Sequence, residues 1–244
     1  RLSGVDAESV RPREKMAATI DCKRYMRKKS TEKPSKATIL PDNFMERYSL
    51  NPEKLSVWET EGISKEALEK FQVRYDDFSD RLVYPIRNLS GQIVNIGGRT
   101  LDPEWKRKEL RKYCYFYSWG TMDTIYGLAE NMDSILEKKE IILFEGCKSV
   151  LIASSWGIHN TGALLTSHLN GNQMKILARL GCRVVFALDK EIDIRKDKNI
   201  QRLKQFVNVE TVFDAENLLA EKDAPVDKGI DVFRKVYIGR KKLR

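Results

Sequence analysis

Three acidic residues lie at the ends of two short apolar runs. The run 141–144 ends in Glu145, and the run 184–188 ends in Asp189, with Glu191 shortly after it. Carboxylate oxygens suit Mg²⁺ or Mn²⁺, and such ions assist displacement at a phosphate ester. Alternatively, each acid only caps the helix that follows its strand. Two strands that end in the same way favour the metal interpretation.

The two apolar runs are typical of buried strands. Runs this short, with helical patterns between them, indicate parallel strands of an α/β sheet. Because ligands of such sheets bind at the carboxyl ends of the strands, we expect Glu145, Asp189 and Glu191 to converge at one edge. Alternation along an extended segment turns Lys190 to the other side, and Asp193 continues the acidic pattern as a predicted metal ligand.

A β-hairpin is predicted upstream. β-forming residues at 82–86 and 93–96 flank the turn sequence 88–91, and Gly97-Gly98 permits a close approach of the backbone. Arg87 and Arg99 flank this glycine pair on either strand. Guanidinium groups hold phosphates through paired hydrogen bonds, so the hairpin is predicted to contact phosphate.

Two further segments carry candidate contacts. Lys148, at the start of the helix after Glu145, is predicted to meet a phosphate. The aromatic segment 113–119 could stack bases, but core packing between subdomains is the favoured role. Cys147 is not predicted to be a nucleophile, because no histidine is demonstrably near it.

These motifs resemble a known family. Glu145-Gly146, the segment 162–167 and Asp189-x-Glu191 resemble the Toprim domain shared by bacterial DnaG-type primases, topoisomerases and some nucleases. The segment 82–99 resembles the one that precedes Toprim specifically in DnaG-type primases. Lys112-Tyr113 and the segment 125–128 follow in the family's order, so the resemblance covers roughly residues 50 to 240.

The resemblance implies a site and also shows departures from the family. Asp223 and Asp227 look like its third acidic motif, with altered spacing. Ser149 stands where Toprim usually has a trailing acid, and Thr121 lies where a basic residue is usual. The implied catalytic residues are Glu145, Asp189 and Glu191, and Asp193 joins them as a metal ligand. The implied nucleotide and nucleic-acid contacts are Arg87, Arg99, Lys112, Tyr113 and Lys148.

The resemblance also implies an activity. It is RNA primer synthesis on a single-stranded DNA template, from ribonucleoside triphosphates and with Mg²⁺ or Mn²⁺. A replicative helicase is an expected partner through regions outside this sequence. The alternatives are a Toprim nuclease, which uses the same acids, and a non-catalytic nucleic-acid-binding module. A topoisomerase is disfavoured, because the domain that supplies its nucleophilic tyrosine is absent.

Composition agrees with a nucleic-acid partner. The net charge is +9 and the pI is about 9.3, and excess Lys and Arg favour an anionic partner. No apolar run approaches a membrane span, so no membrane association is expected. The four cysteines are scattered, which indicates reduced thiols in the cytoplasm. They could not build a primase zinc module, so the chain, which opens at Arg1, is interpreted as a fragment.

The expected fold class is α/β. We predict a basic N-terminal arm or linker at 1–48, an α+β primase-type subdomain at 49–137, and a Toprim domain with a mainly parallel central sheet at 138–240. The segment 239–244 is predicted to be a surface tail or the start of a linker.

Overall fold

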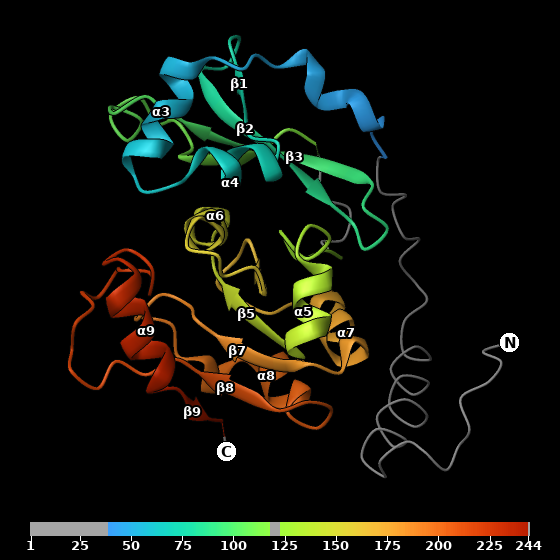
Figure 1. The fold of residues 1–244 in the computed structure, drawn as a ribbon, viewed down its shortest axis with the longest axis vertical. Helices are drawn as coiled ribbons and strands as arrows, with labels where there is room; N and C mark the ends of the chain where they lie inside the picture. The colour runs from blue at the N-terminus through green and yellow to red at the C-terminus, as the bar shows by residue number, and fades with distance from the viewer. Residues whose placement is uncertain (1–38, 118–122, 244) are drawn as a thin grey trace, which may run out of the picture.

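The computed structural model describes residues 39–117 and 123–243. Their strands form a four-stranded antiparallel sheet and a five-stranded, mainly parallel sheet. Figure 1 shows the antiparallel sheet at the top, the mainly parallel sheet below it, and helix α6 (Cys147–Ser155) between them. This arrangement confirms the predicted α/β fold class.

The antiparallel sheet follows chain order. Its strands are β1 (Arg74–Asp76), β2 (Arg81–Arg87), β3 (Ile93–Thr100) and β4 (Tyr113–Tyr115). β2 and β3 form the predicted hairpin. At its turn, the Asn88 side-chain oxygen accepts hydrogen bonds from the backbone amides of Ser90 and Gln92, each at 3.0 Å.

Short helices precede this sheet. They are η2 (Asp42–Arg47), α3 (Pro52–Thr60) and α4 (Lys65–Lys70). Ser64 is the N-cap of α4, and its hydroxyl accepts a hydrogen bond from the Ala67 amide at 3.2 Å. Residues 39–48 of the predicted arm pack on the sheet: Met45 is buried, and the Leu40 amide donates to the Ile93 carbonyl. Residues 1–38 of the arm lie outside the described part of the chain.

The mainly parallel sheet carries the predicted acidic edge. Its strands are β5 (Glu140–Phe144), β6 (Thr161–Ala163), β7 (Arg183–Phe186), β8 (Val209–Thr211) and β9 (Lys241–Lys242), in the order β6-β5-β7-β8-β9. β5 pairs in parallel with both β6 and β7, so the two apolar runs are neighbours as predicted. β9 pairs antiparallel with β8. The predicted C-terminal tail is therefore part of the sheet, because residues 241–242 pair with β8 as the edge strand.

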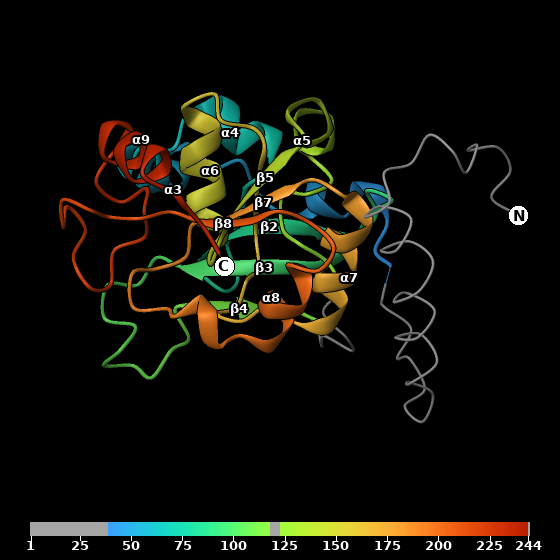
Figure 2. The same ribbon diagram turned by 90° about the horizontal axis from the view of Figure 1, so that it is seen from below.

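Helices cover both faces of this sheet. They are α5 (Met132–Lys138), α6, α7 (Gly171–Leu180), η3 (Ile194–Lys196), α8 (Lys198–Leu203) and α9 (Ile230–Ile238). Figure 2 shows α6 and α9 on one side, and α7 and α8 on the other. Each face of the sheet has its own apolar core, and alternate residues of β5 belong to different cores. Ile142 and Phe144 pack on the α6 side, and Ile141 and Leu143 pack on the other.

One apolar cluster joins the two sheets. Tyr84 of β2 contacts the Tyr126 ring edge-to-face at 5.3 Å, and Phe71 stacks on Tyr126 at 5.7 Å. The same cluster contains Phe144 of β5 and Phe233 of α9. Because this core is continuous, the two sheets hold the residues between them in fixed positions.

Half-buried rings of the aromatic segment 113–119 pack against neighbouring aromatic residues where the segment is described. Phe116 lies edge-to-face against Tyr48 at 6.4 Å, and Tyr117 packs in the same way against Phe44 at 6.1 Å. These two rings therefore pack on the antiparallel sheet and not between the subdomains, whereas Tyr115 packs against the cluster that joins the two sheets. Trp119 lies outside the described residues.

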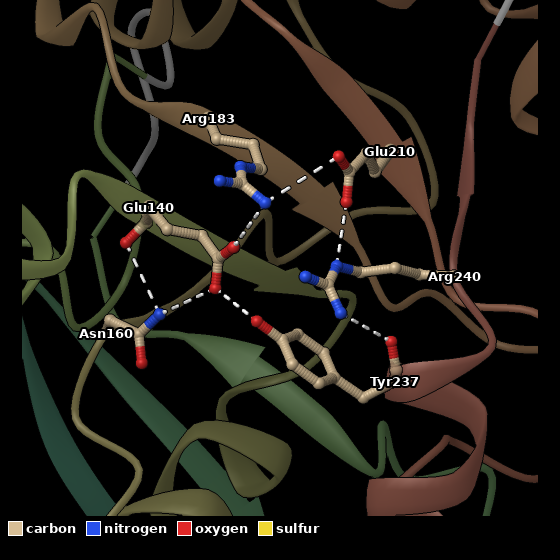
Figure 3. Close-up of polar contacts among 6 residues, drawn as sticks. All are labelled: Glu140, Asn160, Arg183, Glu210, Tyr237 and Arg240. Atoms are coloured by element: carbon tan, nitrogen blue, oxygen red, sulfur yellow. Dashed lines mark hydrogen bonds and ion pairs between the residues drawn. The ribbon is translucent and has the colours of Figure 1, made fainter.

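A polar network ties the C-terminal helix to the amino ends of the strands. Figure 3 draws its members, which are Glu140, Asn160, Arg183, Glu210, Tyr237 and Arg240. The buried Glu140 carboxylate accepts hydrogen bonds from the Tyr237 hydroxyl and from the Asn160 amide, the latter at 3.2 Å. Arg240 donates to Glu210 at 2.7 Å. The helix that follows the third acidic motif is therefore fixed to the sheet at the end opposite the predicted site.

Within the described residues, no helix combines the length and the apolar character needed to cross a bilayer.

Candidate active site

Acidic side chains meet at the carboxyl edge of the parallel sheet. Glu145 directly follows β5, and Asp189 follows β7, which pairs with β5. Burial, followed by the negative charge of Glu145, raises the pKa of the Asp189 carboxyl to about 6. Burial, followed by the charge of Glu191, likewise raises the pKa of Glu145, and His168 opposes this shift. The three predicted catalytic acids are therefore close enough to repel one another.

The third acidic motif reaches the same place. After Glu145, the acids that raise the pKa of Asp189 are Asp227, Glu191 and Asp223. The Asp223 carboxylate accepts a hydrogen bond from the Ala220 amide, and the Asp227 carboxylate accepts one from the Ala224 amide. Each acid thus closes a tight turn in the segment before α9. The assignment of Asp223 and Asp227 to a third acidic motif stays a prediction.

The chemistry of these groups suits a hard divalent cation. Several ionised carboxylates at one edge repel one another unless a cation lies near them. Oxygen ligands favour Mg²⁺ or Mn²⁺. Within the described ranges, no group of three or more His, Cys, Asp or Glu side chains could hold a metal ion as it stands. The carboxylates are therefore gathered but not closed on a common point.

The chain after Asp189 does not remain extended. The Ile192 amide donates to the Asp189 carbonyl at 3.0 Å, so residues 189–192 form a turn. The predicted every-second-residue pattern from Asp189 through Asp193 is therefore wrong. Asp193 instead caps η3, and its carboxylate accepts hydrogen bonds from the Arg195 amide and guanidinium. These bonds lower the pKa of Asp193.

The Lys190 side chain is anchored to the loop after β8. Its ammonium donates to the Leu219 carbonyl at 2.7 Å and lies 3.3 Å from the Asp214 carboxylate. Beside it, a pocket of about 220 Å³ opens between the loops after β7 and β8. Its lining is largely apolar and includes Val212 and Pro225, with Asp189 also among the lining residues. Sequence reasoning did not identify the anchoring role of Lys190.

Positive charges from the antiparallel sheet and α6 face this edge. Burial lowers the pKa of Lys112, and the nearby charges of Arg99 and Lys148 lower it further. Asp227 opposes this shift and also raises the pKa of Asp189, so its charge acts on both the basic and the acidic groups. Three of the predicted phosphate contacts are thus brought together next to the acidic edge.

Two of these cations lie over the face of the Tyr113 ring. Its ring centroid is 5.6 Å from the Arg99 guanidinium carbon and 6.0 Å from the Lys112 ammonium nitrogen. Burial raises the pKa of its hydroxyl, so the ring is neutral over the physiological range. The predicted nucleotide contact at Tyr113 is therefore placed within the basic group.

Lys148 already has an anionic partner inside the protein. Its Nζ lies 2.6 Å from the Glu61 Oε2, and both side chains are about one-third exposed, at 30% and 33%. Glu61 also opposes the lowering of the Lys112 pKa. Sequence reasoning missed Glu61, because a single acid after a short helix carries no signal of a distant partner.

Arg87 lies apart from the other predicted phosphate contacts. It is at the far end of β2, since β2 pairs with β3 in a register that places Leu82 opposite Arg99. Its guanidinium donates to the Gly91 carbonyl at 2.6 Å and lies 3.5 Å from the Glu130 carboxylate, which is 10% exposed. The structure therefore gives Arg87 partners within the protein rather than a place beside Arg99.

The glycine pair is required by close packing. A Cβ on Gly97 would lie 2.3 Å from the Tyr84 ring, and one on Gly98 would lie 2.8 Å from the Phe116 ring. The Tyr84 ring in turn lies next to Cys147, whose thiol is buried and has its pKa raised by burial to about 11. This agrees with the expectation that Cys147 is not a nucleophile.

The departures from the resembled pattern fall at two places. Ser149 is buried within α6, so no acid takes part at that position. Thr121 lies outside the described residues.

The chain matches known proteins in sequence. Residues 34–115 match the family model of the DNA primase catalytic core, N-terminal domain. Over 216 residues the chain is 31% identical to the SPbeta prophage-derived uncharacterized protein YorJ of Bacillus subtilis (strain 168), covering 75% of this chain and 57% of that protein. Over 122 residues it is 30% identical to the DNA primase of Buchnera aphidicola subsp. Baizongia pistaciae, covering 50% of this chain and 21% of that protein. The chain thus spans less than two thirds of the length of either relative.

The chain also resembles solved structures. The Aquifex aeolicus primase, in a structure of its zinc-binding and RNA polymerase domains, matches with a TM-score of 0.65 at 22% identity, over 83% of this chain and 60% of that one. A DnaG primase catalytic domain bound to single-stranded DNA matches with a TM-score of 0.63 at 17% identity, over 82% of this chain and 77% of that one. These likenesses show a shared fold.

Proposed function

We propose that this chain, which contains the N-terminal domain of a DNA primase catalytic core and has the fold of DnaG catalytic cores, synthesises RNA primers on single-stranded DNA. One observation carries the proposal: Lys148 of the basic group lies in the first turn of α6, shortly after Glu145, and the charge of Asp227 acts on both Lys112 and Asp189. Nucleotidyl transfer requires both the basic and the acidic groups, because the phosphate must be held while its charge is neutralised.

The proposed reaction joins two nucleotides. The 3′-hydroxyl of one attacks the α-phosphate of an incoming ribonucleoside triphosphate, the bond to the β-phosphate oxygen breaks, and pyrophosphate leaves. Glu145, Asp189 and Glu191 would hold Mg²⁺ or Mn²⁺, which activates the hydroxyl and neutralises phosphate charge when bound. The raised pKa of Glu145 also suits it to accept the hydroxyl proton, so its role is metal ligand or proton acceptor.

The basic group would position the triphosphate and the template. Arg99, Lys112 and Lys148 supply cationic donors for phosphate oxygens, and the Tyr113 ring offers an apolar surface beside them. Asp193 has no part in this assignment, because Arg195 engages its carboxylate. The net charge of +9 supports an anionic template, as does the fold shared with a primase domain that binds single-stranded DNA.

The wider assignment follows the same proposal. We assign residues 49–137 to a primase-type N-terminal subdomain and residues 138–240 to a Toprim domain. The partners are single-stranded DNA, ribonucleoside triphosphates and the RNA primer, with a replicative helicase engaged through other regions. The described cysteines are free thiols, which supports a cytoplasmic location.

The test is primer synthesis by the purified chain on single-stranded DNA, with labelled ribonucleotides and Mn²⁺. Asp189→Asn is expected to abolish the labelled RNA. The matched control is Asp231→Asn in α9, since the Asp231 side chain is 90% exposed and pairs only loosely with Arg234, at 3.7 Å. Degradation of the template that depends on Asp189 would instead establish a nuclease. Binding of DNA without either reaction, and without Mn²⁺ binding at the acids, would establish a non-catalytic module.

A further inference from the structure

Glu61 places a carboxylate among the groups proposed to hold phosphate. Its Oε2 lies 2.6 Å from the Lys148 Nζ, a charge-assisted contact at hydrogen-bond distance. Its charge also acts on Lys112 and on Tyr113, in each case raising the pKa of that group. One carboxylate is therefore close to three of the proposed phosphate contacts.

The backbone that carries Glu61 is firmly held. Glu61 follows α3 directly, between the fully buried Trp58 and the buried Ile63. The next residue, Gly62, has a φ of +90°, and the Ser64 amide donates to the Ser155 hydroxyl of α6 at 2.8 Å. The Glu61 side chain, by contrast, is 33% exposed. Its carboxylate can therefore leave Lys148 by side-chain rotation, without movement of the main chain.

A carboxylate and a phosphate oxygen compete for the same ammonium donors. Each accepts hydrogen bonds from Lys148, but a triphosphate carries several negative charges and reaches several cations at once. We propose that Glu61 is a built-in counter-anion of the phosphate site, which neutralises Lys148 in the free protein and is displaced when the triphosphate binds. This inference rests on the proposed function, because it assumes that Lys148 meets a nucleotide phosphate.

The displacement has a measurable consequence. The free energy needed to separate Glu61 from Lys148 is subtracted from the binding free energy of every phosphate ligand. Ligands of low charge are the least able to displace Glu61. A structural ion pair between α3 and α6 would behave differently: its loss would lower stability and leave phosphate affinity unchanged. Exposed ion pairs contribute roughly 0.2–1 kcal/mol, so removing the competitor should tighten binding by about 1.4- to fivefold.

The experiment measures inorganic tripolyphosphate binding by calorimetry, with the full chain in EDTA at low salt. Glu61→Gln is expected to lower the Kd about 1.4- to fivefold relative to the unmodified chain. Glu59→Gln is the matched control: it removes the same charge from α3, but its carboxylate contacts Lys65 at 4.0 Å instead of Lys148. Lys148→Met is expected to weaken binding and to remove most of the gain from Glu61→Gln in the double variant. Thermal unfolding of each variant shows whether it is folded at the temperature of the binding experiment.

The outcomes separate this inference from the proposed function. A Glu61→Gln variant that binds no tighter than Glu59→Gln overturns the inference, and so does a chain that does not bind tripolyphosphate at all. Primer synthesis is measured independently with Asp189→Asn. A chain that binds tripolyphosphate as expected but makes no primer would retain the role of Glu61 in phosphate binding and refute the primase proposal alone.

Discussion

The Lys190 ammonium lies 3.3 Å from the Asp214 carboxylate and joins the loop after β7 to the loop after β8. It also donates to the Leu219 carbonyl at 2.7 Å, while Asp214 accepts the Leu218 and Leu219 amides at 2.8 and 2.9 Å. Because Lys190 adjoins Asp189 in the chain, these contacts fix the turn that carries the central acid of the site.

Lys190→Met is therefore expected to reduce the rate of primer synthesis. Misplacement of a reacting group by about 1 Å can cost roughly 100-fold, so we expect a fall in kcat of about 10- to 100-fold, with a smaller change in KM. Lys235→Met is the control, because its partner Glu216 lies in the same loop but is 60% exposed. Equal effects of the two substitutions on kcat would refute a positioning role for Lys190.

The raised pKa of Asp189 makes stability depend on pH. The folded protein holds this proton up to about pH 6, whereas the ordinary value is 3.8, so stability should fall as pH rises from about 4 to about 6. The full two-unit shift corresponds to about 3 kcal/mol, but solvent screening at a half-buried carboxyl reduces this to about 1 kcal/mol.

Asp189→Asn should remove this pH dependence and make the metal-free protein about 1 kcal/mol more stable near neutral pH. Urea unfolding in EDTA at pH 5 and pH 7.5 measures the difference between the two proteins. Mn²⁺ should then stabilise the unmodified chain at pH 7.5 more than the variant. A variant that is less stable than the parent at pH 7.5 in EDTA would contradict the proposed repulsion.

Arg87 and Arg99 should have separable roles. Replacing Arg87 with Met removes the ion-pair partner of the Glu130 carboxylate, which is 10% exposed, and leaves it only the charge of Lys70. Losses of a buried ion-pair partner typically cost about 3–5 kcal/mol of unfolding free energy. Arg99→Met should cost little stability but weaken binding to single-stranded DNA. It should also make the logarithmic salt dependence shallower by about 0.7, the value for one lost phosphate contact.

Fluorescence anisotropy with a labelled oligothymidine, measured between about 50 and 200 mM salt, tests this separation. The salt slope of Arg87→Met should match that of the unmodified chain at temperatures where it is folded. A reduced slope for Arg87→Met together with an unchanged slope for Arg99→Met would reverse the assignment.

Local patterns made much of the fold predictable. The apolar runs that form β5 and β7 need burial on both faces, and parallel pairing places their carboxyl ends together. The position of Glu145 and Asp189 at one edge of the sheet was therefore predictable from the sequence. The turn at 88–91 and the Ser64 cap were predictable for the same reason, because their hydrogen bonds join residues close in the chain.

Features that depend on distant partners were not predictable. Nothing near Glu61 indicates Lys148, and nothing near Arg87 indicates Glu130, because both pairs form only when the two sheets pack together. The C-terminal pairing of β9 with β8 also joins segments far apart in sequence. The turn at 189–192 was missed for another reason: acidic alternation is compatible with a strand but does not require one.

Gly97 is required because the Tyr84 ring occupies the space of its side chain. A Cβ at Gly97 would lie 2.3 Å from the ring, and the fully buried Tyr84 cannot move without disturbing Tyr126, whose centroid is 5.3 Å away. Gly97→Ala is therefore expected to cost about 1–3 kcal/mol of unfolding free energy in urea titrations. Gly146→Ala is the control, because a Cβ there would meet no atom within 4 Å.

In a Tyr84→Leu background the clash is absent, so the cost of Gly97→Ala should fall to a few tenths of a kcal/mol. An equal cost in both backgrounds would show that Tyr84 is not the obstacle.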